Sequence, residues 1–317
     1  MKRALLVLAA VLLTAAPSLA AAPPPAIEDP EATVLSELVV RAVRPSPAWW
    51  TVQKGASVVY ILGTPDEPLP KRMVWNQAAL QQHLAGADVL IVPVVATAGL
   101  GDIPALLRMM SRLKSKAPME QSLAAPLQAR FEAARTRLGK PISRYDHRDP
   151  IWSGQILVND FFDSAGMTRN EPLAAIRKAV GRAHVPVRPA ASYRAMEILT
   201  PAVRSLTPEI SQACLAEALD EVEAGSGALE AASAAWAKGD VPGVLAGPRG
   251  FASCLLLIQG GAALWRQTMA QEADAVAAEL AKPGHAVAVF PIRSMVATDG
   301  ILARLKARGF DVSAGRS

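Results

Sequence analysis

Few side chains in this sequence have a type and spacing that could do chemistry, and two adjacent carboxylates come first among them. Asp66 and Glu67 follow the apolar, partly β-branched run 57–62, which stops at Gly63. Carboxylates at the end of a strand can bind a cation or accept hydrogen bonds from the N-terminus of a helix. The sequence leaves both roles open for this pair.

Histidines are the next candidates, because imidazole is a common metal ligand and general base. None of the four, at positions 83, 147, 184 and 285, lies in an H-E-x-x-H or H-x-x-x-H arrangement. His147 has carboxylates beside it, but we interpret its segment 144–149 as a polar loop between helices. The sequence also lacks a G-x-S-x-G turn, a Walker-type phosphate loop and a G-x-G-x-x-G motif. The commonest signatures of zinc peptidases, serine hydrolases and nucleotide-binding proteins are therefore absent.

Two cysteines, Cys214 and Cys254, are predicted to form a disulfide if the chain matures in an oxidising compartment. The bond would close a loop of roughly 40 residues and stabilise the fold by about 3–4 kcal/mol. Two buried free thiols or a redox pair are the alternatives. A catalytic dithiol usually has C-x-x-C spacing, which this pair does not have.

Hydrophobic patterning predicts the elements that position these residues. Strands are expected at 49–52, 57–62, 89–92, 184–188, 285–290 and 310–312. Helices are expected at 76–85, 103–138, 150–162, 172–183, 208–224, 229–238, 251–280 and 299–308, with an interruption of the stretch 251–280 at Gly260-Gly261. A strand, a helix and a second apolar strand in succession indicate a βαβ unit. The fold class is therefore predicted as α/β, with a central mixed sheet flanked by helices and a large helical insertion.

The N-terminus reads as a signal peptide over residues 1–20. Lys2 and Arg3 precede an uncharged run that is shorter than the roughly 20 residues needed to span a bilayer, and Ser18-Leu19-Ala20 offers a cleavage site. Cleavage after Ala22, or an uncleaved anchor, is the alternative. A flexible, proline-rich linker is expected over 21–46, in which residues 33–43 could form a short helix, and one domain is expected over 47–317. We expect a periplasmic or secreted chain without stable membrane insertion after cleavage.

Composition narrows the class of partner. Loss of the two basic residues of the signal peptide reduces the formal net charge from +5 to +3. No basic run is interleaved with aromatic residues, so nucleic acid is not an expected partner.

Several segments, in order, resemble the TraB/GumN family, which is related to the Tiki metalloproteases. They are 47–52 (PAWWTV), 59–66 (VYILGTPD), 74–80 (VWNQAAL), 85–90 (AGADVL), 235–240 (AWAKGD), 264–267 (LWRQ), 286–289 (AVAV), 298–302 (TDGIL) and 308–312 (RGFDV). The resemblance covers nearly all of residues 47–312. It implies the family's α/β domain with a helical insertion.

The resemblance also implies a metal site, but most of its residues are replaced here. The family's first Gly-x-x-His corresponds to Gly63 through Asp66. Its following Glu corresponds to Pro93, a later Glu to Ala190 or Ala191, and its second Gly-x-x-His ends at Ser294. A hydrolytic metal site needs about three deprotonated ligands and an open position, which proline, alanine and serine do not supply. The sequence thus resembles a divergent member without the family's metal-site motifs.

One functional position of the family, Arg266, looks retained. It could hold an anion in the former pocket or pair with a carboxylate such as Asp88 or Glu272.

Three hypotheses follow. The first is a catalytically degenerate, exported protein without a cofactor, which binds or scaffolds an unidentified periplasmic protein or peptide. The second is a peptidase or hydrolase that uses a divalent metal such as Zn or Mn at a rearranged site around Asp66, Glu67 and Arg266. The third is a redox or disulfide-linked partner acting through Cys214 and Cys254. The sequence favours the first hypothesis and leaves the question of enzyme activity open.

Overall fold

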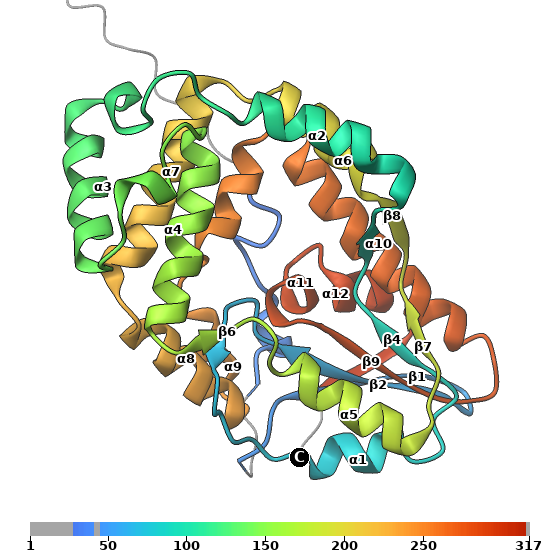
Figure 1. Cartoon of the computed structure of the whole chain (residues 1–317). Helices are drawn as coiled ribbons and strands as arrows, with labels where there is room; N and C mark the ends of the chain where they lie inside the picture. Colours follow the sequence, from blue (N-terminus) through green and yellow to red (C-terminus); the bar gives the residue numbers. More distant parts are fainter. Residues whose placement is uncertain (1–27, 41–44, 315–317) are drawn as a thin grey trace, which may run out of the picture.

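A six-stranded mixed sheet forms the centre of the protein, which we describe from a computed structural model that defines residues 28–40 and 45–314 (Figure 1). The strand order is β10-β1-β2-β9-β4-β7. β1 is antiparallel to β2 and β10, whereas β2, β9, β4 and β7 run parallel to one another. The bounds are β1 Trp49–Lys54, β2 Ser57–Thr64, β4 Leu90–Val92, β7 Val187–Pro189, β9 Gly284–Pro291 and β10 Asp311–Ala314. The predicted α/β class with a mixed sheet is confirmed.

The middle strands are buried because their side chains are apolar and partly β-branched, which suits a strand covered on both faces. Ile61 and Leu62 of β2 and Val287 of β9 are fully buried. The β1–β2 hairpin turns at Gly55, whose φ of 59° is one that glycine adopts without strain. Both strands of this hairpin and β9 lie where the sequence predicts them.

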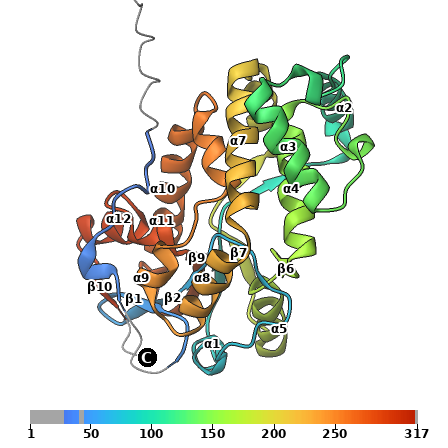
Figure 2. The same ribbon diagram turned by 90° about the vertical axis from the view of Figure 1, so that its left-hand side faces the viewer.

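Helices cover both faces of the sheet (Figures 1 and 2). α1 and α5 lie on one face, and α10, α11 and α12 lie on the other. Their bounds are α1 Ala78–Leu84, α5 Leu173–Ala183, α10 Gly261–Glu279, α11 Ile292–Val296 and α12 Ile301–Ala307. The predicted helical stretch 251–280 is divided at Gly260 into a 3-10 helix, η5 (Phe251–Leu257), and α10.

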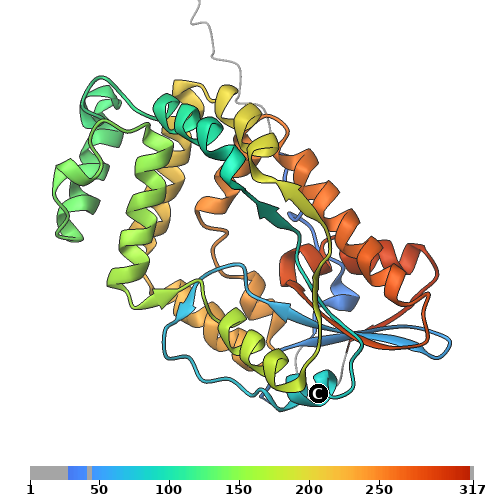
Figure 3. The ribbon, with the colours of Figure 1, turned by 45° about the vertical axis from the view of Figure 1, so that its right-hand side comes forward.

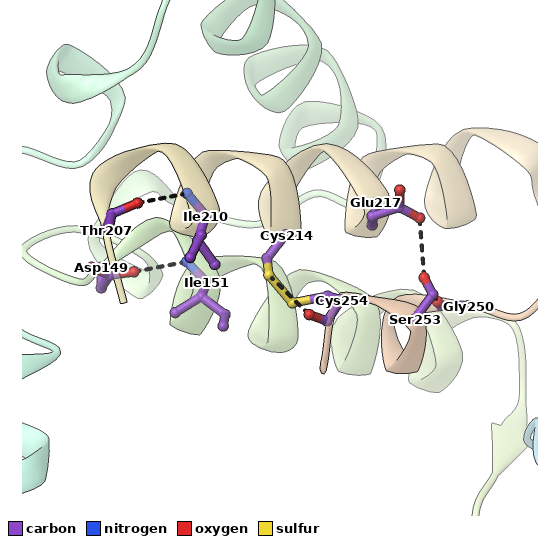
Figure 4. The surroundings of a disulfide bond; sticks show 9 residues. All are labelled: Asp149, Ile151, Thr207, Ile210, Cys214, Glu217, Gly250, Ser253 and Cys254. Atoms are coloured by element: carbon purple, nitrogen blue, oxygen red, sulfur yellow. Dashed lines mark hydrogen bonds between the residues drawn. A yellow bond between two sulfur atoms is a disulfide. The ribbon is translucent and has the colours of Figure 1, made fainter. Parts of the chain in front are cut away.

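The predicted helical insertion is present and has its own hydrophobic core, separate from that of the sheet. It is built mainly from α3 (Ala125–Arg137), α4 (Pro150–Ser164) and α7 (Pro208–Ala224). Its core includes the buried side chains of Phe131, Tyr145 and Leu215. The N-termini of α4 and α7 are capped by the side chains of Asp149 and Thr207, which accept from the N–H groups of Ile151 and Ile210 (Figure 4).

A disulfide between Cys214 and Cys254 joins α7 to η5 (Figure 4). Both cysteines are fully buried. Beside the disulfide, the Oγ of Ser253 in η5 donates a hydrogen bond at 3.2 Å to Glu217, which lies on α7 with Cys214. The predicted pairing is thus present in the structure. It fixes η5 against the insertion.

Two helices project beyond the sheet on a small parallel ribbon. β5 (Val95–Thr97) and β8 (Ser192–Arg194) continue past the ends of β4 and β7 and lead into α2 (Ile103–Arg112) and α6 (Ala195–Arg204). The two helices lie side by side at one edge of the molecule (Figures 1 and 3). We call this ribbon and its two helices the arm. The sequence predicts α2 but not α6, which contains Pro201 in its interior.

Four smaller elements lie on the side of the molecule away from the arm (Figure 1). They are β3 (Leu69–Pro70), β6 (Met167–Thr168), α8 (Gly227–Ala237) and α9 (Val241–Leu245). Trp236 of α8 is fully buried, and its Nε1 donates to the carbonyl oxygen of Gly63 at 2.8 Å. Among the helices of residues 28–40 and 45–314, none is both long and apolar enough to cross a bilayer.

The chain ahead of β1 is more ordered than the sequence predicts. Part of the expected flexible linker, residues 28–40, lies against the domain. Leu38 is 1% exposed, its carbonyl accepts from Trp50 Nε1 at 3.1 Å, and Val34 forms a β-bridge with Ala297. Burial of Leu38 and these backbone contacts hold the segment against the domain. The predicted signal peptide 1–20 lies outside the described residues.

Removal of the disulfide should destabilise the protein. The variant C214S/C254S is expected to lose about 3–4 kcal/mol of unfolding free energy, because its unfolded chain regains the freedom of a loop of roughly 40 residues. Guanidinium unfolding followed by circular dichroism measures the difference. Reduced wild-type protein should behave like the variant, and thiol titration of unreduced protein should find no free thiol. A variant as stable as the oxidised wild type would contradict the prediction.

Candidate functional site

A large chamber lies at the carboxyl ends of β2, β4 and β9, between the sheet, the arm and the insertion. It has a volume of about 1020 Å³. Parallel strands that end together leave their following residues at one edge, where α/β proteins commonly bind ligands. The lining residues are Asp66, Pro93, Val94, Leu106, Met109, Met110, Leu113, Ile151, Trp152, Gln155, Ile198, Leu199, Pro201, Ala202, Val203, Leu206, Phe251, Leu255, Ile258, Gln259, Gly260, Gly261, Leu264, Trp265, Thr268, Glu272, Pro291 and Ser294.

The floor of the chamber holds three of the positions that the family resemblance singled out. Asp66 follows β2, Pro93 follows β4, and Ser294 lies in α11 just after β9. Glu272 of α10 joins them and accepts a hydrogen bond from the N–H of Val94 at 3.2 Å. The strand ends therefore bring together residues that lie far apart in the sequence.

The walls are almost entirely apolar. They come from α2 and α6 of the arm, from α4, from η5 and from the first turns of α10. Leu106, Leu199 and Leu255 are 41%, 41% and 48% exposed although they line this cavity. Large apolar side chains in an open, concave surface are characteristic of ligand and partner sites.

The two carboxyl groups of the floor hold their protons more tightly than usual. Desolvation, reinforced by the nearby Glu31, raises the pKa of Asp66 to about 7. The side chain of Asp66 is exposed to the chamber, so water there hydrates its carboxylate and opposes this rise. Desolvation, followed by the charges of Glu31 and Asp66, raises the pKa of Glu272 to about 7. Near neutral pH the floor can both donate and accept hydrogen bonds.

Glu31 reaches the floor from the N-terminal segment. It is 3% exposed and accepts a hydrogen bond from the Oγ of Ser294. Arg249 pairs with Glu31 at 3.2 Å and with Asp29 at 2.8 Å. The segment that the sequence describes as a linker thus supplies the buried carboxylate that holds Ser294.

Glu67 has different surroundings from its neighbour Asp66. It is not among the lining residues of the chamber. A methyl group placed on Gly250 would lie 3.0 Å from Glu67 Oε2 and 3.1 Å from both carboxylate oxygens of Glu221, so the two side chains meet at this glycine. Desolvation and the charge of Glu221 raise the pKa of Glu67 to about 8. Asp66 and Glu67 therefore do not face one common ligand site.

The other predicted site residues have structural surroundings. A Cβ at Gly63 would lie 2.6 Å from Ile292 and 2.7 Å from Trp50, so only glycine fits there. The carbonyl of Ala191 accepts from the N–H of Val95 at 3.0 Å, where the β5–β8 ribbon begins. Arg266 does not line the chamber and pairs with Glu28 rather than with Asp88 or Glu272.

The residues of the floor do not fit a divalent metal. Pro93 has no ligating side chain, and the hydroxyl of Ser294 is engaged by Glu31. Within the described part of the chain, no three His, Cys, Asp or Glu side chains gather closely enough to hold a metal ion. The arrangement suits the binding of an apolar molecule above a small polar floor.

The sequence did not reveal several residues that shape this site. Glu272 is a single carboxylate in a long helical pattern, and Glu31 stands in a proline-rich stretch. Only the apolar spacing of Leu35 and Leu38 near Glu31 hints that its segment is ordered.

Stability should fall as pH rises from about 5 to about 8.5. The folded chain keeps protons on the partly buried Glu67 and the buried Glu272 up to pH 7–8, whereas the unfolded chain releases them near pH 4. Between these values the folded state binds more protons, so the unfolding free energy decreases with pH. Denaturant unfolding at pH 5.5 and 8.5 measures the decrease.

The variant E272Q tests the cause. Glutamine keeps the acceptor for the Val94 N–H but cannot ionise, and Glu272 is 2% exposed. In E272Q the decrease in unfolding free energy between pH 5.5 and 8.5 should be smaller than in the wild type by about 1–3 kcal/mol. The exposed control E230Q should leave it unchanged, and an unchanged decrease in E272Q would contradict this account.

The comparisons with known proteins agree with the family resemblance. The model of the TraB/PrgY/gumN family matches residues 48–314. No curated protein and no solved structure matches the chain significantly. The match spans every strand of the central sheet, the helical insertion and all the residues of the chamber. This chain belongs to the TraB/PrgY/gumN family.

Proposed function

We propose that this protein is a non-catalytic binding protein that holds a largely apolar ligand in its chamber. The observation that carries the proposal is the apolar wall, in which Leu106, Leu199 and Leu255 line a cavity of about 1020 Å³ and stay more than 40% exposed. Exposed apolar area of this kind is costly in water and is stabilised when a ligand covers it.

The energy available from such a ligand is sufficient for tight binding. Each buried methylene contributes about 0.8 kcal/mol, so a chain of about ten contributes roughly 8 kcal/mol before the entropic cost of association. The carboxyl groups of Asp66 and Glu272 add hydrogen-bond partners at one end of the cavity. An alkyl chain or a cluster of apolar peptide side chains has the required chemistry.

The proposal also includes the place of the protein in the cell. The features of residues 1–20 support export to the periplasm or beyond, and the disulfide is consistent with an oxidising compartment. The partner that delivers or receives the ligand would then be a periplasmic protein or peptide.

The alternative of a metal-dependent peptidase around Asp66 and Glu67 receives less support. These two carboxylates face different surroundings, and Arg266 lies away from the chamber. A hydrolase would need a nucleophile or an activated water in the chamber, and the floor supplies only Asp66, Glu272 and the engaged hydroxyl of Ser294.

Binding of the fluorescent apolar probe N-phenyl-1-naphthylamine tests the proposal. The mature chain should bind it and enhance its fluorescence. The double variant L106Q/L199Q should weaken binding at least about tenfold, because each lost apolar contact contributes on the order of 1 kcal/mol. Both leucines are partly exposed, so the fold should tolerate the changes.

Leu107 provides a matched control. It lies next to Leu106 on α2 and is 61% exposed, but it does not line the chamber. L107Q should bind the probe like the wild type. Equal loss in L107Q, or no binding by the wild type, would refute the proposed function.

Metal analysis after dialysis against zinc and manganese distinguishes the alternative. A stoichiometry near zero is expected. About one tightly held metal per chain, lost in the variant D66N and accompanied by peptide cleavage, would favour the hydrolase instead.

A further inference from the structure

The chamber has one acidic end and otherwise apolar walls. Asp66 and Glu272 are the only charged side chains among the described residues that line it, so no basic side chain faces the cavity. On α10, Leu264 and Trp265 line the apolar part near the start of the helix. Thr268 and Glu272 follow at intervals of three and four residues, which keeps them on the same helix face. This face therefore leads from the apolar wall to the acidic floor.

Both carboxyl groups of the floor have acceptor oxygens that the protein does not use. The side chain of Asp66 is exposed to the chamber and makes no hydrogen bond or ion pair with another residue of the described ranges. Glu272 is 2% exposed, and its Oε1 accepts from the N–H of Val94 at 3.2 Å. No residue within 28–40 or 45–314 donates to its Oε2. Carboxylate oxygens that lack donors favour a ligand that supplies them.

The charge around the floor is predominantly negative. Glu31 adds a third carboxyl group, and its charge raises the pKa of both Asp66 and Glu272. The guanidinium groups of Arg293 and Arg249 oppose this rise in the pKa of Asp66. Neither arginine lines the chamber, because Arg249 pairs with carboxylates of the N-terminal segment and Arg293 donates to two backbone carbonyls. The chamber itself thus offers room for a positive charge.

We propose that the ligand of the chamber is a cationic amphiphile, an alkylamine whose ammonium group binds to Asp66 and Glu272 while its hydrocarbon part lies against the walls. This inference rests on the proposed function and names the class of ligand. An ammonium group has three N–H donors and no acceptor, so it suits a floor of free carboxylate oxygens. Charge-assisted hydrogen bonds of this kind are stronger than those of a neutral hydroxyl group.

The walls favour a hydrocarbon chain over a peptide. Apart from the floor, the lining side chains with hydrogen-bonding groups are those of Gln155, Gln259 and Thr268. A peptide would bring an amide group with each residue, and amides that leave water without a hydrogen-bond partner are unfavourable. A hydrocarbon chain carries no such groups. The distribution of polar groups therefore matches a ligand with a single polar end.

A structural role does not account for both carboxyl groups. Acceptance of the Val94 N–H explains an acceptor at Glu272, but an uncharged glutamine would serve equally well. Asp66 holds no other part of the described chain, so its carboxyl group stabilises no contact there. Binding of an ammonium group explains both residues.

Calorimetric titration with decylamine, decanol and decanoate at pH 7.5 and constant ionic strength tests the inference. The wild type should bind decylamine at least about tenfold more tightly than decanol, and decanoate more weakly than decanol. The variant D66N/E272Q should lose the preference for the amine and still bind decanol normally. Its fold should be retained, because glutamine still accepts from Val94 and Asp66 is exposed.

Two further variants separate local charge from other effects. The control E132Q/E230Q removes the same number of negative charges from exposed positions elsewhere and should keep the preference for decylamine. D66N alone changes one exposed side chain and leaves Glu272 in place. It should reduce the preference at least about threefold without a change in decanol affinity.

The outcomes separate the inference from the proposed function. Equal wild-type affinity for decylamine and decanol, or a preference that persists in D66N/E272Q, would overturn the amine site and leave the chamber as an apolar site. Trileucine amide, which has a free amino terminus, should bind more weakly than decylamine. Tighter binding of this peptide would overturn the inference in favour of a peptide ligand. No binding of any decyl compound would refute the proposed function itself.

Discussion

The parallel pairing of β2 with β9 determines where two polar groups of the chamber floor, Asp66 and Ser294, lie. Thr64 is opposite Pro291 in the register, so the residues after both strands emerge at the same edge of the sheet. Gly63 permits this arrangement, because any side chain there would collide with Ile292 and Trp50. The carbonyl of Gly63 is held in turn by Trp236. Asp66 and Ser294 face one chamber because the two strands that precede them end together at this edge.

The chamber is a consequence of two cores that do not merge. The sheet with its helices forms one core, and the insertion forms another. The space between them is bridged by η5, which the Cys214–Cys254 disulfide ties to α7, and by α10, which begins at Gly260. Apolar side chains of η5 and the arm therefore face a cavity instead of a packed interior. An open apolar surface of this kind is typical of ligand and partner sites.

Much of the sheet could be predicted from the sequence, because its strands are short apolar runs ended by glycine or proline. Asp66 could be singled out as a carboxylate at a strand end, whereas Pro93 and Ser294 were identified only through the family resemblance. Cys214 and Cys254 could be paired because no other cysteine competes for them. Local patterns carry no information about Glu31 and Glu272, whose roles arise from contacts with residues far away in sequence. α6 escaped prediction for a related reason: Pro201 interrupts its pattern, and its exposed apolar face matches a cavity instead of a core.

The distribution of charge within the chamber argues for one orientation of a ligand that has a polar end. Carboxyl groups occupy the floor, so an anionic group would meet repulsion or, at best, neutral acids there. A neutral or cationic polar group could instead form hydrogen bonds with Asp66 and Glu272, while the apolar part of the ligand lay against the walls formed by α2, α6 and η5. The floor would then select the ligand by the charge of its polar end, and the walls would select it by its apolar area.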